Sequence, residues 1–286
     1  MRHALSWCRA WAAMLVFAAG CAAAADPGKA WFDQGRPGAQ AHEAVALLAA
    51  AATHGLDPRD YRAEALQQAV WQASTGPEPD AATAARLDGA LTQAMQRYLE
   101  DLHRGRIDPR ALAQGYRLPP RAAFDAAATL REALAAQRLA DAAREAAPQL
   151  PQYERLREAL ARYRALADHP AWRAALPPLP GKGKLEPGQA WAGLATLAQR
   201  LAALGDLQGD APANAARYED RLVEAVRAFQ RRHGLEPDGV IGAGTLAQLQ
   251  VSPAARARQI ELALERLRWT PLLQAPRMIV INIPEF

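Results

Sequence analysis

The chain has 286 residues, of which half are hydrophobic and 22% are charged, and its formal net charge is +4. Alanine alone supplies 70 residues, so large apolar side chains are scarce and helices are favoured over sheets. The basic charge comes almost wholly from arginine and is no sign of a nucleic-acid partner. Two cysteines exclude a disulfide scaffold and a Cys-rich zinc site.

The N-terminus has the layout of an export signal. Arg2 and Arg9 are followed by an apolar run over residues 10–20 and by small residues up to Ala25. We therefore expect a periplasmic protein that is cleaved after Ala25, which would lower the net charge to +2. The alternatives are a retained membrane anchor and a lipoprotein that carries its lipid on Cys21, so we expect membrane attachment only through this segment.

Helical patterns dominate the chain up to residue 168. Apolar residues at three- and four-residue spacing predict helices over 42–54, 81–104, 122–147 and 153–168. Two Asp-Pro pairs, which begin at Asp57 and Asp108, place an aspartate to cap a helix and a proline at its first position. The Pro- and Gly-rich stretch 177–188 then predicts a linker.

The rest of the chain predicts a second helical group. Helices are expected over 191–204, 218–233, 246–250 and 253–269, and Thr245 and Gln248 match a capping box. The β-prone run 277–283 is the only convincing strand. Because a single strand leaves its backbone groups unpaired, either it pairs with something outside this sequence or the sequence is incomplete.

Most catalytic patterns are missing. None of the three serines lies in a Gly-x-Ser-x-Gly elbow, and no His-Glu-x-x-His occurs. Both cysteines, Cys8 and Cys21, lie in the export segment, so the predicted mature chain has no thiol. We expect no metal and no cofactor, and the chemistry favours a binding module over an enzyme.

Two families are resembled. The pattern that begins Leu197-x3-Leu201-x2-Leu204-Gly205 and continues Ala225-Val226-Arg227-x-Phe229-Gln230-x2-His233-Gly234-Leu235-x2-Asp238-Gly239 resembles the small three-helix peptidoglycan-binding domain. Its flanks are similar to large periplasmic L,D-transpeptidases: Gly55-Leu56-Asp57-Pro58-x2-Tyr61 and Arg97-Tyr98-x2-Asp101-Leu102 to their scaffold domain, and Arg266-Leu267-Arg268-Trp269-Thr270-Pro271 to the entry of their catalytic domain.

The second resemblance implies cell-wall remodelling. In that family a β-rich domain carries Ser-His-Gly-Cys, whose thiolate takes an acyl group from a tetrapeptide stem before a second stem forms a 3→3 crosslink. Nothing here matches that motif, so no catalytic residue is carried over and we expect the chain as written to be inactive. The resemblance implies the non-catalytic front part of such an enzyme, truncated as its catalytic domain begins. The alternatives are a stand-alone peptidoglycan-binding scaffold protein and a half-enzyme that a separate catalytic chain completes.

We therefore predict a mainly α chain with five segments. They are an export signal (1–25), a helical scaffold domain (26–180), a linker (181–190), a peptidoglycan-binding domain (191–250), and a linker helix with one unpaired catalytic-domain strand (251–286). The expected partners are peptidoglycan, through its glycan strand or stem peptide, and other cell-wall enzymes. Within the pattern that resembles the peptidoglycan-binding domain, the residues expected to face the glycan or stem peptide are Arg227, Gln230, His233 and Asp238.

Overall fold

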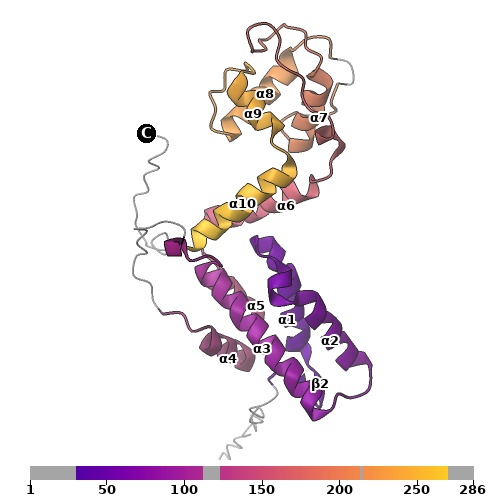
Figure 1. Ribbon diagram of the computed structural model, residues 1–286. Coiled ribbons are helices and arrows are strands. Elements are labelled where there is room, and N and C mark those ends of the chain that lie inside the picture. The colour runs from indigo at the N-terminus through magenta and orange to yellow at the C-terminus, as the bar shows by residue number, and fades with distance from the viewer. Residues whose placement is uncertain (1–29, 112–122, 213–214, 270–286) are drawn as a thin grey trace, which may run out of the picture.

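The computed structural model describes most of the chain, namely residues 30–111, 123–212 and 215–269. These residues form ten α-helices and one small two-stranded hairpin, so the predicted mainly α fold is confirmed (Figure 1). None of the helices in these ranges is long and apolar enough to cross a membrane. The predicted export signal, Cys21 and the predicted strand 277–283 lie outside the described residues.

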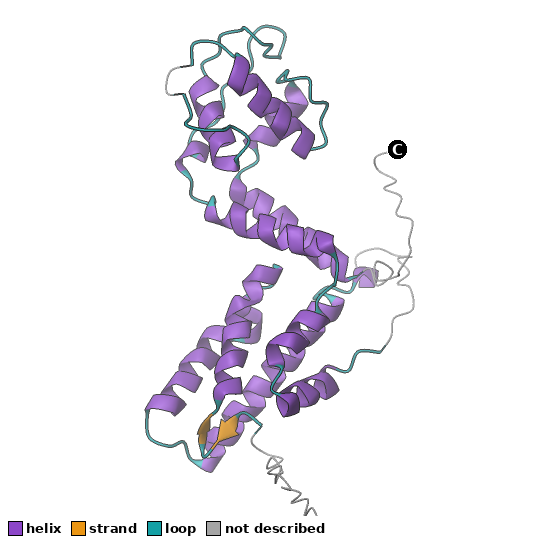
Figure 2. Cartoon of the chain, turned by 180° about the vertical axis from the view of Figure 1, so that it is seen from behind, coloured by secondary structure: helices purple, strands orange, loops and turns teal. Residues whose placement is uncertain are grey.

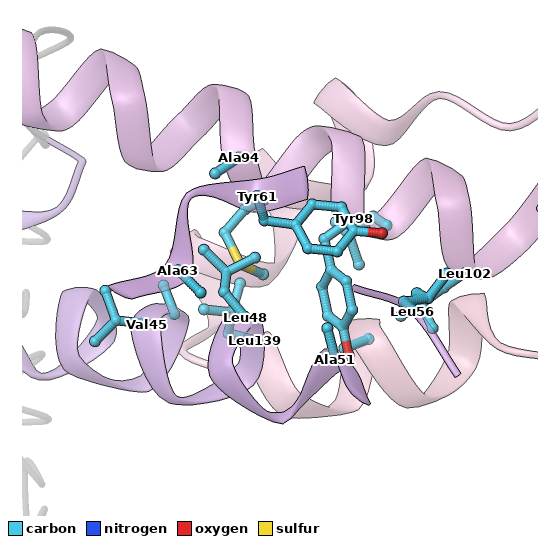
Figure 3. Packing of buried hydrophobic residues seen from close by; sticks show 14 of the residues in the cluster. Val45, Leu48, Ala51, Leu56, Tyr61, Ala63, Ala94, Tyr98, Leu102 and Leu139 are labelled. Atoms are coloured by element: carbon cyan, nitrogen blue, oxygen red, sulfur yellow. The ribbon is translucent and has the colours of Figure 1, made fainter. Parts of the chain in front are cut away.

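A first hydrophobic core gathers the N-terminal helices. They are α1 (Ala39–Ala49), α2 (Ala63–Thr75), α3 (Ala81–Arg104), α4 (Ala126–Ala136) and α5 (Leu139–Ala146). The centre of this core is aromatic as well as aliphatic, because the rings of Tyr61 and Tyr98 meet edge to face with centroids 5.4 Å apart (Figure 3). Each fully buried leucine around them contributes about 1.5–3 kcal/mol to folding.

The long helix α3 has the predicted bounds. Asp80 caps it, since its carboxylate accepts a hydrogen bond of 2.7 Å from the Thr83 amide, and Gly105 follows its last residue. The apolar residues at three- and four-residue spacing are buried against the other helices, as the periodicity predicts: Leu87, Leu91, Met95, Tyr98, Leu99 and Leu102.

Three local features differ from the sequence prediction. The pattern over 42–54 covers α1 and a following 3-10 segment, η1 (Ala50–His54). The pattern over 122–147 is broken into α4 and α5, because Gln137 adopts a left-handed backbone conformation with φ +54°. The Asp-Pro pairs begin the 3-10 segments η2 (Pro58–Tyr61) and η3 (Pro109–Ala111) rather than α-helices.

The hairpin at the start of the described chain is a feature that the sequence prediction missed. It pairs β1 (Phe32–Asp33) with β2 (Arg36–Pro37) in antiparallel register and lies at one end of the helices (Figure 2). The preceding Trp31 is buried, and its indole donates a hydrogen bond of 2.8 Å to the Thr92 hydroxyl. The hairpin is therefore fastened to α3.

A helix pair, which we call the stalk, connects this core to the rest of the protein. It consists of α6 (Pro151–Ala165), which leaves the first core, and α10 (Pro253–Arg268), which runs back antiparallel to α6 (Figure 1). Leu264 and Ala257 of α10 are part of the first core. The described part of segment 251–286, assigned to a linker helix from sequence, thus packs on helices that lie far earlier in the chain.

The end of α10 is held by a buried ion pair. Arg268 Nη1 lies 3.0 Å from Glu265 Oε2, and Arg268 Nη2 donates a hydrogen bond of 2.8 Å to the Tyr153 hydroxyl. Glu265 also accepts a hydrogen bond of 2.9 Å from the Ile107 amide, just after α3. These contacts fix the C-terminal end of α10 against the first core.

A second core lies at the far end of the stalk. It is built by α7 (Leu194–Leu204), α8 (Asp220–Arg232) and α9 (Ala243–Gln250), and the short segment η4 (Pro170–Trp172) packs beside α7 (Figure 1). Leu185, inside the stretch expected to be a linker, is fully buried in this core and bridges to Ile241 through two backbone hydrogen bonds of 3.0 Å. This part of the chain is therefore packed into the second unit.

The predicted capping box at the start of α9 is wrong. Gly242 is the N-cap residue and no side chain caps the helix. Thr245 is buried and its hydroxyl accepts a hydrogen bond from Gln230, while Gln248 accepts one from Arg256. Because α9 begins at Ala243, Thr245 lies within the helix, where its side chain is buried.

Candidate functional site

The second unit contains all four residues that the sequence singles out. Gln230 is buried in α8 and organises the turn that follows. Its Oε1 accepts a hydrogen bond of 2.9 Å from the Gly239 amide, and its Nε2 donates to Asp238 Oδ1 at 2.9 Å and to the Val240 carbonyl at 3.0 Å. Both polar atoms of its side-chain amide form hydrogen bonds within the protein, and these bonds hold the turn.

Asp238 is exposed, but its carboxylate is also used by the turn. Besides Gln230, Oδ1 accepts a hydrogen bond of 2.8 Å from the Val240 amide. The neighbouring Gly239 has φ +78°, and a Cβ there would lie 2.8 Å from a methyl carbon of Val223, so this position requires glycine. The structure brings Gln230 and Asp238 together in the frame of a turn.

His233 lies at the C-terminal end of α8, with its ring centroid 4.1 Å from that of Phe229. Its Nε2 atom is buried and has no hydrogen-bond partner among the described residues. Burial, together with the charges of Arg232 and Arg256, lowers the pKa of His233 to about 4. The imidazole is therefore neutral near pH 7 and lies on the side of the unit that meets the stalk.

Of the four predicted residues, Arg227 is the one that lines a groove. Its Nη1 pairs with Glu224 Oε1 at 2.6 Å, and its Nη2 reaches the Asp238 carbonyl at 3.4 Å. The side chain borders an open groove of about 760 Å³ along α8, which is a size suited to a small ligand or a peptide segment. Gln230, His233 and Asp238 do not line it.

The groove has charged walls and an apolar floor. Leu207, Val223 and Ala225 are buried beneath it. The charged residues that line it besides Arg227 are Asp206, Asp220, Arg221, Glu224 and Arg231. These charged residues are not among the site residues predicted from the sequence. The spacing itself was the available signal, since residues four apart on a helix share one side.

The described residues contain no group of three or more His, Cys, Asp or Glu side chains that could hold a metal ion. A separate ion pair connects the second unit to α6. Asp206 pairs with Arg232 at 2.5 Å, and Arg232 also donates a hydrogen bond of 2.9 Å to the hydroxyl of Tyr163 in α6. This bridge joins the second unit to the stalk.

Comparison with known families gives a class to each unit. A family model described as "Scaffold domain" matches residues 23–160, which include α1–α5 and most of α6. A second model, described as "Putative peptidoglycan binding domain", matches residues 192–249, which include α7–α9. No curated protein matches the chain. The protein thus combines a scaffold domain with a peptidoglycan-binding domain, and peptidoglycan is the partner that this second domain supports.

Proposed function

We propose that this protein is exported to the periplasm and binds peptidoglycan as the non-catalytic N-terminal part of an L,D-transpeptidase. The observation that carries the proposal is the family match over residues 192–249, whose three helices enclose a core of their own. The order of the two matched domains agrees with the architecture of those enzymes and supports the finer assignment.

The arrangement of the stalk suits a positioning role. α6 and α10 pack against each other, and their scaffold ends are buried in the first core. At the other end, Arg232 and Tyr163 join the stalk to the peptidoglycan-binding domain. A wall-binding domain on such a double connection would hold the scaffold at a defined distance from the wall.

We do not assign the crosslinking reaction to residues 26–286. Residues 26–286 contain no cysteine, and the resembled enzymes use a cysteine thiolate to take the acyl group. The role we assign to these residues is binding and placement, and the crosslinking step requires a nucleophile that they do not supply.

Cosedimentation with isolated sacculi tests the proposal. The purified protein should pellet with sacculi at low and moderate salt and remain in the supernatant with microcrystalline cellulose, an insoluble glycan without stem peptides. A protein that stays in solution with sacculi under both salt conditions, while circular dichroism shows it folded, would refute wall binding.

A further inference from the structure

A charged stripe on α8 faces the groove. Asp220, Glu224, Arg227 and Arg231 follow one another at intervals of four, three and four residues, which places them on one side of the helix. At a rise of about 1.5 Å per residue, the stripe is about 16 Å long. The groove therefore offers a line of charge and not a single charged point.

The stripe is acidic at one end and basic at the other. Asp220 and Glu224 are four residues apart, and so are Arg227 and Arg231, and like charges at this spacing destabilise a helix. The helix dipole favours acids in the first turn and arginines in the last, which accounts for the order of the signs. It does not account for both like-charged pairs lying along one groove.

The two ends of the stripe present charge that the protein leaves available. In the middle, Glu224 and Arg227 pair with each other at 2.6 Å. Asp220 and Arg231 are exposed, and within the described part of the chain neither forms an ion pair or a side-chain hydrogen bond. A ligand with a cation at one end and an anion at the other would match them.

The groove lacks the surface that sugars require. Carbohydrate rings are commonly bound by stacking on exposed aromatic side chains, but none of the described groove-lining residues is aromatic. Tyr218 and Phe229, which belong to the same unit, are fully buried in its core. A glycan strand has no cationic group to pair with Asp220 and Glu224 and is therefore a poor match to the groove.

We infer that this groove takes the stem peptide of peptidoglycan, an inference that rests on the proposed function. Stem peptides carry free carboxylates and, at a diamino acid, a free amine. The amine would lie near Asp220 and Glu224 and the carboxylates near Arg227 and Arg231. An extended tetrapeptide is about 13 Å long, which fits the length of the stripe.

Titration of the full chain with two soluble fragments of sacculi tests the inference. The disaccharide tetrapeptide released by a muramidase should bind, and glycan strands freed of peptide by an amidase should not. The double variant R227E/R231E should weaken binding of the disaccharide tetrapeptide by about tenfold or more, because it sets like charges against the carboxylates.

The matched control is R131E/R155E, which changes the net charge equally. Arg131 and Arg155 are exposed on α4 and α6, outside the peptidoglycan-binding domain. This variant should bind as the unaltered protein does, and equal melting temperatures would show that both variants fold. The inference is overturned if peptide-free glycan binds as well as the disaccharide tetrapeptide, or if R227E/R231E binds normally. In either case cosedimentation of the unaltered protein with sacculi would leave the proposed function standing, whereas its loss would remove both.

Discussion

Among the described residues, each of the two units buries one arginine, and the two form different kinds of hydrogen bond. In the peptidoglycan-binding unit, Arg200 donates hydrogen bonds of 2.9 Å to the carbonyls of Ala171 and Leu249 and a third, of 2.5 Å, to that of Ala174. In the scaffold unit, Arg268 pairs with a buried carboxylate, that of Glu265. Because Arg200 has only neutral acceptors, burial lowers its pKa.

The two arginines also differ in how far apart in sequence the segments that they join lie. Arg200 ties together segments that lie within about 80 residues of one another, so the second unit is continuous in sequence. Arg268 joins α10 to Tyr153, and Glu265 joins it to Ile107, 115 and 158 residues apart in sequence. The scaffold is therefore completed by a helix that enters only after the whole peptidoglycan-binding unit.

Removal of α10 should have the largest effect on stability, and this effect should be confined to the scaffold unit. A chain that ends at Gln250 should keep the second unit folded but lose roughly 5 kcal/mol or more from the first, because Leu264 and its neighbours no longer cover the scaffold core. Urea unfolding followed by circular dichroism would then show two separate transitions, with the scaffold unfolding earlier. A scaffold of undiminished stability would contradict the role given to α10.

Arg268→Ala should destabilise the scaffold unit by about 3–5 kcal/mol, because it leaves Glu265 buried without its partner. The double variant R268M/E265Q, which removes both charges, should recover part of this loss. Urea unfolding of the two variants measures the difference. Equal stabilities for R268A and the unaltered protein would show that the ion pair does not hold α10 in place.

Gln230→Leu should cost the second unit about 2–3 kcal/mol, since the Gly239 amide and the Val240 carbonyl lose a buried partner. Gln72→Ala, on the exposed side of α2, serves as the control and should change stability by less than about 0.5 kcal/mol. Thermal unfolding compares the two. A harmless Q230L would mean that the turn is held by its glycine and aspartate alone.

One partly buried histidine in each unit, His54 or His233, makes stability depend on pH. Burial, helped by the charges of Arg157 and Arg268, lowers the pKa of His54 to about 3. The pKa of His233 is lowered to about 4. Both values lie below the unfolded value of about 6.5, so the unfolded chain binds protons first as the pH falls. Stability is therefore full above about pH 6.5 and declines below it, by at most about 1.4 kcal/mol per pH unit for each histidine.

The variants His54→Gln and His233→Gln separate the two contributions. Each should flatten the fall in unfolding free energy between pH 6.5 and 5, the first for the scaffold transition and the second for the other unit. Urea titrations at several pH values measure these slopes. Unchanged slopes in both variants would assign the pH dependence to other groups.

Strong periodicity and caps made much of the fold predictable. The pattern over 81–104 gives the bounds of α3, because Asp80 and Gly105 mark its ends and its apolar residues share one face. The break at Gln137 was not predictable, because glutamine has no preference for the left-handed backbone conformation that it adopts there. The return of α10 to the first core depends on contacts across more than 100 residues, which no local pattern encodes.

The candidate site was predictable only in part. The Asp-Gly turn indicates the right unit, but only the structure reveals that the side-chain amide of Gln230 is buried against backbone groups. Asp220 and Arg231 were not predicted, because charged residues at helical spacing occur on most exposed helices. What distinguishes α8 is the groove beside it, and a groove is a property of packing between elements.

The most direct measurement is the fraction of purified protein that sediments with intact sacculi and with sacculi stripped of stem peptides by an amidase. The account predicts that most of the protein pellets with intact sacculi at moderate salt and that the stripped material retains only a background amount. Equal sedimentation with both would contradict stem-peptide recognition, and sedimentation with neither would contradict peptidoglycan binding itself.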